Sequence, residues 1–270
     1  MKKIDYDYLL ENVADIDICQ KLFNNNICVN DGSFCHRRFY FRGQSNSNWS
    51  LTPSIVRDEK PEPKINSNCN LFDEIAKFQH NGVKTRFLDF TTNFLVALFF
   101  ACDEKYDDID GKLFVCEYYD ALSESSNYTK FISYFTQLTS DVSFEKFCDN
   151  FNIPDDEKHV ILAFLESGFM IQPSQEYYKQ IETSNKKMYL QQGCFYVPSN
   201  DSNYSEIKYQ PKILSNNYPN LNIKNKISLD WLLNSKILVS TILIPENLKK
   251  DIRVYLKSKN ITSKALGFEE

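Results

Sequence analysis

The uncharged run from Asn93 to Ala101 constrains the fold of this chain more than any other part of its sequence. After Asn93 it reads Phe-Leu-Val-Ala-Leu-Phe-Phe-Ala, which is apolar on every side at helical spacing. Thr91 and Thr92, just before it, are residues that cap helices. A helix without a polar face has to be covered all round, so we expect it at the centre of the core.

Strands and amphipathic helices are predicted around this central segment. Phe39-Tyr40-Phe41 is an aromatic run typical of a buried strand, and Lys112–Tyr119 follows the turn Asp110-Gly111 as a second strand. Later strands are predicted over residues 187–190, 194–197, 212–214 and 237–244. Helices are predicted over residues 71–79, ending at Asn81-Gly82, and over 248–256, ending at Asn260.

These elements predict one α+β domain spanning residues 1–270, with a mixed, mainly antiparallel sheet flanked by helices. Residues 1–36 are expected to form a helical lead-in. Residues 120–185 are expected to form a helical insertion, with helices near 144–151, 155–165 and 176–182. Such an insertion can cover a site. We find no internal repeat and no linker that divides the sequence.

Charge, hydropathy and cysteine spacing exclude several classes of protein. The formal net charge of −5 argues against a protein that grips nucleic acid with its whole surface. The sequence has no apolar run long enough to cross a membrane and no apolar stretch after Met1, so we expect a cytoplasmic protein without a membrane partner. The cysteines form no CxxC pair and no zinc-like spacing with histidine, so we expect reduced thiols and no metal.

Polar residues crowd into the segment Gln79–Thr91, just before the central helix. His80 falls in the last turn of a predicted helix, and Asp89 precedes the central one. Arg42 follows the first predicted strand, and Gln192 stands beside a glycine before a later strand. Side chains that are held on rigid elements in this way can converge on one ligand site.

The chemistry of these side chains favours an anionic ligand. The guanidinium groups of Arg42 and Arg86 are rigid, always charged forks that suit phosphate, and free N–H groups at the start of the central helix suit phosphate as well. Structural roles stay open beside this one. Arg42 and Asp89 can form a buried ion pair that fixes strand to helix. His80 can complement the helix dipole, and Gln192 can satisfy backbone groups at a strand edge.

Several motifs, in the same order, resemble the FRG domain family, which is named for its Phe-Arg-Gly motif. They are Phe41-Arg42-Gly43-Gln44, Trp49–Ser54 with Arg57, Gln79–Thr91 and Tyr189–Phe195. The resemblance extends from about residue 37 to the C-terminal helix, and it implies a single FRG domain.

The same motifs resemble, more distantly, the ADP-ribosyltransferase fold, in which a first-strand Arg-Gly or His-Gly holds NAD. In this resemblance Arg42-Gly43 is the first element, Asp89–Thr91 with Leu98–Ala101 lines the nicotinamide pocket, and Gln191–Gly193 is the last element. Many such transferases have a Glu in the last element, where this chain has Gln192, which can hydrogen-bond but cannot act as a base. Asp89, Glu176 or Glu182 would then supply the carboxylate.

The resemblance implies a role for each candidate catalytic residue. Arg42 orients the phosphates or ribose of NAD, and His80 contacts the ligand or positions an acceptor. Asp89 orients Arg42 or Arg86, and Gln192 holds the nicotinamide ribose. NAD is the implied cofactor, used as a substrate, and no metal is implied. The residues expected to contact NAD are Arg42, Gly43, Gln44, Thr85, Arg86, Thr91 and Phe99.

The resemblance also implies a function. The protein would transfer ADP-ribose from NAD to a macromolecular acceptor, a protein or a nucleic acid, or cleave NAD without an acceptor. Both reactions damage a bacterial cell, which fits a toxin or an anti-phage defence effector with a separate trigger or neutralising partner. The competing hypothesis is a non-catalytic module that binds a nucleotide, a nucleic acid or a protein through the same pocket. A hydrolytic nucleic-acid effector is disfavoured by the scarcity of clustered carboxylates, and no GxSxG, P-loop or HExxH motif is present.

Overall fold

The structure, a computed structural model, describes the greater part of the chain. The described residues are 10–24, 37–58, 63–64, 71–119, 121–123, 142–158, 161–162, 168–182, 185–198, 200–202, 222–227 and 238–268. Within these ranges no helix combines the length and the apolar character needed to cross a membrane.

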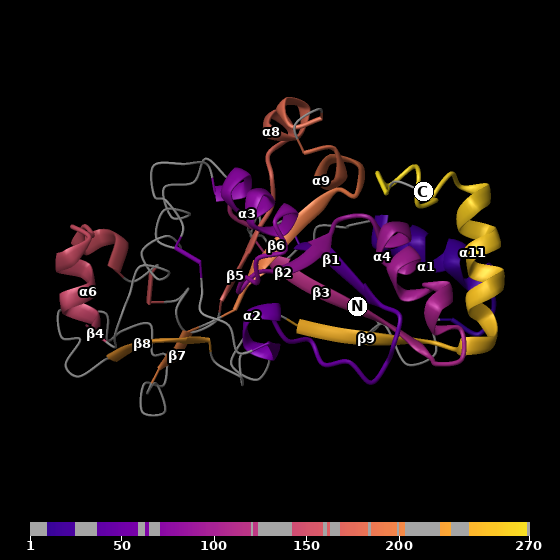
Figure 1. Ribbon diagram of the computed structural model, residues 1–270, viewed down its shortest axis with the longest axis horizontal. Helices are drawn as coiled ribbons and strands as arrows, with labels where there is room; N and C mark the ends of the chain where they lie inside the picture. Colours follow the sequence, from indigo (N-terminus) through magenta and orange to yellow (C-terminus); the bar gives the residue numbers. More distant parts are fainter. Residues whose placement is uncertain are drawn as a thin grey trace, which may run out of the picture.

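A central antiparallel sheet organises the described residues (Figure 1). Its six strands lie in the order β5-β6-β2-β1-β3-β9. In chain order they are β1 (Arg37–Gln44), β2 (Leu88–Thr91), β3 (Gly111–Tyr119), β5 (Phe169–Ile171), β6 (Gly193–Val197) and β9 (Leu238–Ile244). A second sheet, in the order β4-β8-β7, is built from β4 (Val142–Ser143), β7 (Asn200–Ser202) and β8 (Asn222–Ile227).

Helices flank the central sheet. They are α1 (Ala14–Asn24), α2 (Ser54–Arg57), α3 (Leu71–His80), α4 (Phe94–Ala101), α8 (Gln175–Gln180), α9 (Lys186–Leu190) and α11 (Lys249–Ser258). Helix α6 (Phe144–Asn150) lies beside the second sheet, where it contacts β4 and β8. Short 3-10 turns are η2 (Glu104–Tyr106) and η4 (Glu246–Leu248). The prediction of an α+β fold with a mainly antiparallel sheet is therefore confirmed.

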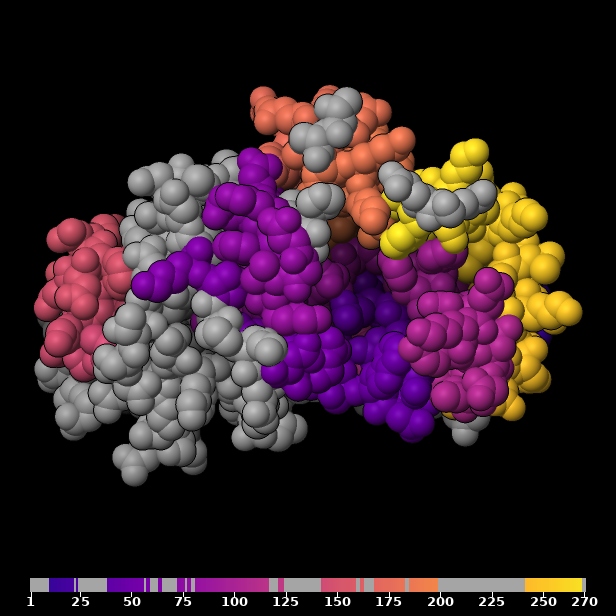
Figure 2. Space-filling model, viewed as in Figure 1, coloured from indigo at the N-terminus to yellow at the C-terminus, as the bar shows by residue number. Residues whose placement is uncertain are grey.

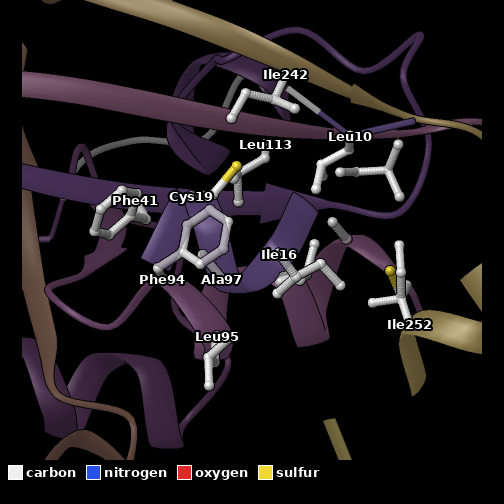
Figure 3. Packing of buried hydrophobic residues seen from close by; sticks show 14 of the residues in the cluster. Leu10, Ile16, Cys19, Phe41, Phe94, Leu95, Ala97, Leu113, Ile242 and Ile252 are labelled. Atoms are coloured by element: carbon white, nitrogen blue, oxygen red, sulfur yellow. The ribbon is translucent and has the colours of Figure 1, made fainter. Parts of the chain in front are cut away.

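Helix α4 lies at the centre of a hydrophobic core, as its all-round apolar sequence predicts (Figure 3). Ala97 and Leu98 have no exposed surface. The core joins α4 to Phe41 of β1, Leu113 of β3 and Ile242 of β9, and also to α1 and α11. Full burial of each large apolar side chain contributes about 1.5–3 kcal/mol, so this cluster anchors one end of the sheet.

The N-cap of α4 is Asn93, and not Thr91 or Thr92 as the sequence predicted. Thr91 belongs to β2, where its backbone pairs with both β1 and β6. Asn93 Oδ1 accepts hydrogen bonds from Leu95 N at 3.0 Å and from Val96 N at 3.4 Å. The sheet thus extends further toward the helix than expected, and the cap moves on to Asn93, whose side-chain oxygen accepts these bonds.

The register of the strands assigns side chains to the two faces of the sheet. Thr91 lies opposite Phe41 on one side and opposite Gly193 on the other, so these three residues share a face. On that face one hydrophobic cluster lies against α1, α4 and α11, and another lies against α3, α8 and α9. Figure 1 shows the two helix groups over different parts of the sheet. Strand β2 lies between them.

Residues 187–190 were predicted as a strand, and this prediction is wrong, because Lys186–Leu190 form helix α9. Asn185 caps this helix, since its Oδ1 accepts a hydrogen bond from Met188 N at 3.4 Å. Gln192 follows the helix in the left-handed conformation, with φ of 49°. Local capping therefore outweighs the β-forming character of the segment.

The segment 120–185 is not purely helical. It contains α6 and α8 as expected, but β4 and β5 also fall within it, and β5 joins the central sheet beside β6. Of the lead-in 1–36, the structure describes residues 10–24, which include α1. The predicted strand at 212–214 lies outside the described residues.

Gly43 allows α4 to pack directly on β1. A Cβ atom at this position would collide with the backbone carbonyl of Ala97 and would lie 2.7 Å from Ala101 N. Gly111 of β3 meets the carbonyl of Ala101 in the same way. The close approach of a helix therefore requires glycine at this position of the Phe-Arg-Gly motif, whatever the function.

We predict that Gly43→Ala lowers the free energy of unfolding by about 2–3 kcal/mol, the upper part of the range for overpacking, because backbone atoms of α4 cannot move away without disturbing the core. Gly193→Ala is the matched control in another strand. There the nearest atom to an added Cβ is 3.4 Å away, so the change should be under about 1 kcal/mol. Urea unfolding followed by circular dichroism measures both. Equal effects of the two substitutions would contradict this account of Gly43.

Candidate functional site

A cleft of about 1260 Å³ opens between the two helix groups, on the face that carries Phe41 and Thr91. Figure 2 shows this face hollowed between α3, the α8–α9 segment in orange and the C-terminal segment in yellow. The floor consists of Phe41, Gly43, Asp89, Thr91, Gly193 and Phe195. One wall consists of Ala97, Phe100, Gly267 and Phe268, and the other of Asn185, Lys186, Lys187, Met188 and Gln191. Ser54, Phe87 and the segment 82–85 also contribute.

Arg42 spans the place where β1 and β2 separate. The two strands pair at Phe41 and Thr91, while Arg42 Nη1 donates a hydrogen bond of 2.7 Å to the carbonyl oxygen of Asp89. The Asp89 carboxylate is 3.7 Å from the same nitrogen. The guanidinium thus replaces a backbone pairing and holds the strands together at the floor of the cleft.

This arginine and its carboxylate partner differ in exposure. The side chain of Arg42 is 23% exposed and that of Asp89 is 60% exposed. Burial lowers the pKa of Arg42, and Asp89 offsets part of that effect, but an arginine stays charged at neutral pH. The Nε atom of Arg42 is buried without a hydrogen-bond partner. Because both side chains are partly exposed and line the cleft, the pair is open to the cleft and is not sealed in the core.

Four cationic side chains line the cleft against one carboxylate. The cations are Arg42, Lys84, Lys186 and Lys187, and the carboxylate is Asp89. Lys84 is partly neutralised, since its Nζ lies 3.2 Å from the carboxylate of Asp58 outside the lining. The chain as a whole carries a net charge of −5, so the positive excess in this cleft runs against the overall charge. Local positive potential of this kind attracts anionic ligands.

The end of β2 is tied to the turn between α9 and β6. Thr91 Oγ1 donates to the carbonyl of Gln191 at 2.6 Å, and Thr92 N donates to the carbonyl of Gln192 at 3.2 Å. The exposed Gln192 side chain lies 3.5 Å from Thr92 Oγ1. Its amide therefore sits at the turn and not among the cleft-lining groups.

The start of α4 has fewer free N–H groups than the sequence predicted. Leu95 N and Val96 N both donate to Asn93 Oδ1, and Asn93 N donates to Thr91 Oγ1 at 2.9 Å. These donors are satisfied within the protein. An anion in the cleft would be held by side-chain cations instead.

Five predicted site residues meet in the cleft, namely Arg42, Gly43, Thr85, Asp89 and Thr91. Four others lie outside its lining, namely Gln44, Arg86, Phe99 and Gln192. Gln44 and Arg86 are buried, and Gln44 donates to the carbonyl of Ser50 at 3.3 Å. His80 ends α3, but its side chain lies outside the described residues.

Sequence reasoning missed the lysines of the cleft and the aromatic side chains of its wall. Lys186 and Lys187 are adjacent and exposed, a pattern that usually marks a solvated surface. Lys84 stood within the polar cluster without being singled out. Phe268 follows the last helix and carried no sequence signal that linked it to the site. Only the fold brings these side chains together.

Two kinds of chemistry are disfavoured in this cleft. Cys194 lines it, but burial raises the pKa of its thiol well above the usual value, so the nucleophilic thiolate is not available. Among the residues that the structure describes, no three His, Cys, Asp or Glu side chains are grouped as metal ligands. The groups in the cleft that can bind a ligand or take part in a reaction are the carboxylate of Asp89 and the cations around it.

The polar segment beside the cleft also lies within a region that matches a known protein family. Residues 63–109 match the FRG domain family model. This FRG match includes Gln79–Thr91 and α4, and it confirms the resemblance to that family. The motif Phe41-Arg42-Gly43 and the segment Tyr189–Phe195 lie outside the matched residues, although the fold places both at the cleft. No curated protein and no solved structure matches the chain.

Arg42 has a structural role through its hydrogen bond to the Asp89 carbonyl, and the exposed Asp89 carboxylate contributes less to that contact. We predict that Arg42→Ala lowers the free energy of unfolding by about 1–3 kcal/mol, because it leaves the Asp89 carbonyl without its partner. Asp89→Asn keeps that carbonyl and changes an exposed group, so it should cost less than about 1 kcal/mol. Thermal or urea unfolding of both variants tests this. A larger loss for Asp89→Asn than for Arg42→Ala would show that the carboxylate carries the contact.

Proposed function

We propose that the cleft binds a phosphate-bearing nucleotide, that its ligand is NAD, and that the protein cleaves NAD as ADP-ribosyltransferase-like enzymes do. The observation that carries this proposal is the excess of cations over carboxylates in one cleft of an acidic chain. Arg42 and the lysines suit the oxygens of a diphosphate, because charge-assisted hydrogen bonds to phosphate are strong and directional.

The size and the apolar surfaces of the cleft also suit a dinucleotide. Its volume of about 1260 Å³ exceeds the range of about 300–1,000 Å³ that is typical of small-molecule sites. Phenylalanine rings from the sheet, from the segment before it and from the α4 wall line it, namely Phe41, Phe87, Phe90, Phe100 and Phe195. Such surfaces can cover the base and the nicotinamide while the cations hold the phosphates.

Asp89 is the residue that we propose for the chemical step. The bond between ribose C1′ and the nicotinamide nitrogen breaks, and its electron pair leaves with neutral nicotinamide. The cationic ribosyl carbon is then attacked by an oxygen of water or of an acceptor, which loses a proton. A carboxylate beside this carbon stabilises the positive charge and can receive the proton. Arg42 positions Asp89 through its backbone carbonyl.

The proposed biological role follows from this reaction. Loss of NAD, or modification of a protein or nucleic acid, harms a bacterial cell, which fits a cytoplasmic toxin or anti-phage effector controlled by a separate partner. A non-catalytic nucleotide-binding module is the second candidate. It is favoured by one observation: Gln192, the residue expected to hold the ribose, lies outside the cleft lining.

The test is incubation of the purified protein with NAD, with nicotinamide release and NAD binding measured in parallel. We expect release that falls about 10²–10³-fold in Asp89→Asn, because an electrostatic contact made in the transition state is lost. Asp108→Asn is the matched control, since Asp108 is exposed and does not line the cleft.

The alternatives give different results in this assay. Binding of NAD without release of nicotinamide, in the presence and absence of cell lysate, would support the non-catalytic module. No binding of NAD would remove the proposal altogether. Equal loss of release in Asp89→Asn and Asp108→Asn would contradict the role of Asp89.

A further inference from the structure

The segment from Ile261 to Phe268, which follows α11, runs from one wall of the cleft toward the other. It leaves α11 through a hydrogen bond from Ile261 N to the carbonyl of Leu256 at 2.9 Å. Leu266 is anchored in the core with 2% of its surface exposed. Gly267, with φ of 82°, turns the chain so that Phe268 enters the cleft lining. We call residues 261–268 the strap.

The end of the strap contacts both helix groups. The ring of Phe268 is stacked on Phe99 of α4, with centroids 6.5 Å apart and planes at 22°. Lys187 Nζ of α9 lies 5.1 Å from the centroid of the same ring. Gln191, just after α9, donates from Nε2 to the carbonyl of Leu266 at 3.1 Å. The strap thus joins the two walls of the cleft above its floor.

We propose that the strap is an autoinhibitory latch. In it the ring of Phe268 contacts the ammonium group of Lys187, a cation that the bound ligand needs. This inference rests on the proposed function, because it assumes an anionic ligand in the cleft. A phosphate draws the Lys187 ammonium away from the ring, since a charge-assisted hydrogen bond is stronger than a cation–π contact at an exposed site. Ligand binding and strap docking then oppose each other.

The size of the effect follows from the contact that is exchanged. Because coupling between two sites is reciprocal, removal of the ring must raise the affinity for the anion by as much as the anion weakens the docked strap. A cation–π contact at an exposed site corresponds to a change of about two- to fivefold in affinity. A ring that is merely part of the binding surface would give the opposite sign, since its loss would weaken binding.

The experiment compares the wild-type protein with Phe268→Ala, and with Lys264→Ala as a control on the exposed part of the strap. Binding of inorganic pyrophosphate and of NAD is measured by calorimetry. Hydrogen exchange of residues 185–191 is measured without ligand. We expect Phe268→Ala to bind pyrophosphate about two- to fivefold more tightly and to exchange faster in 185–191, while Lys264→Ala matches the wild type in both.

The outcomes separate this inference from the proposed function. Tighter pyrophosphate binding without any NAD binding would support the latch and remove NAD as the ligand. NAD cleavage with equal or weaker anion binding in Phe268→Ala would overturn the latch and leave the proposed function standing. Unchanged exchange in residues 185–191, or no binding of either anion to any of the proteins, would also overturn the latch.

Discussion

The close approach of α4 to β1 is the constraint on which the rest of the site depends. The backbone of Ala97 and Ala101 occupies the space where a side chain at residue 43 would stand. This contact gives each residue of the Phe-Arg-Gly motif a separate task. Phe41 packs edge-on against Phe94 of α4, with ring centroids 5.5 Å apart, and Gly43 admits the helix backbone. Arg42, which alternates to the other side, reaches across to Asp89.

The cleft exists because the helices divide into two groups over one face of the sheet. Strand β2 lies between the groups, so Asp89 and Thr91 form part of an open floor instead of a covered core. The hydrogen bonds of Thr91 and Thr92 to the turn before β6 hold this floor together on the side of α9. A rigid floor with cations on β1, on α9 and on the loop before β2 is a suitable arrangement for holding a charged ligand in one orientation.

The sequence was most informative where one local pattern dominates. The position of α4 followed from its apolar circumference, and the end of α3 followed from Gly82, which has φ of 68° as its role after the helix requires. The convergence of Arg42 and Asp89 was also predicted, because each is held on a core element, and Thr85 was expected at the same site from the family resemblance.

Other features depend on tertiary contacts that a single sequence does not reveal. Helix α9 was mistaken for a strand because its side chains suit both, and the cap at Asn185 decides between them. Thr91 was assigned to the helix because its pairing with β6, a hundred residues later in the chain, is not visible locally. The lysines of the cleft resemble solvated surface residues until the fold places them beside Arg42. Phe268 joins the site through the strap alone.

Whether the cleft between α4 and α9 holds the phosphates of a nucleotide can be tested with crystals of the protein soaked with ADP-ribose. We predict electron density for the ligand above Asp89, with diphosphate oxygens within hydrogen-bond distance of Arg42 or of the cleft lysines, about 2.7–3.2 Å. Density for ADP-ribose at another surface, or an unoccupied cleft in crystals where calorimetry shows binding in solution, would contradict it.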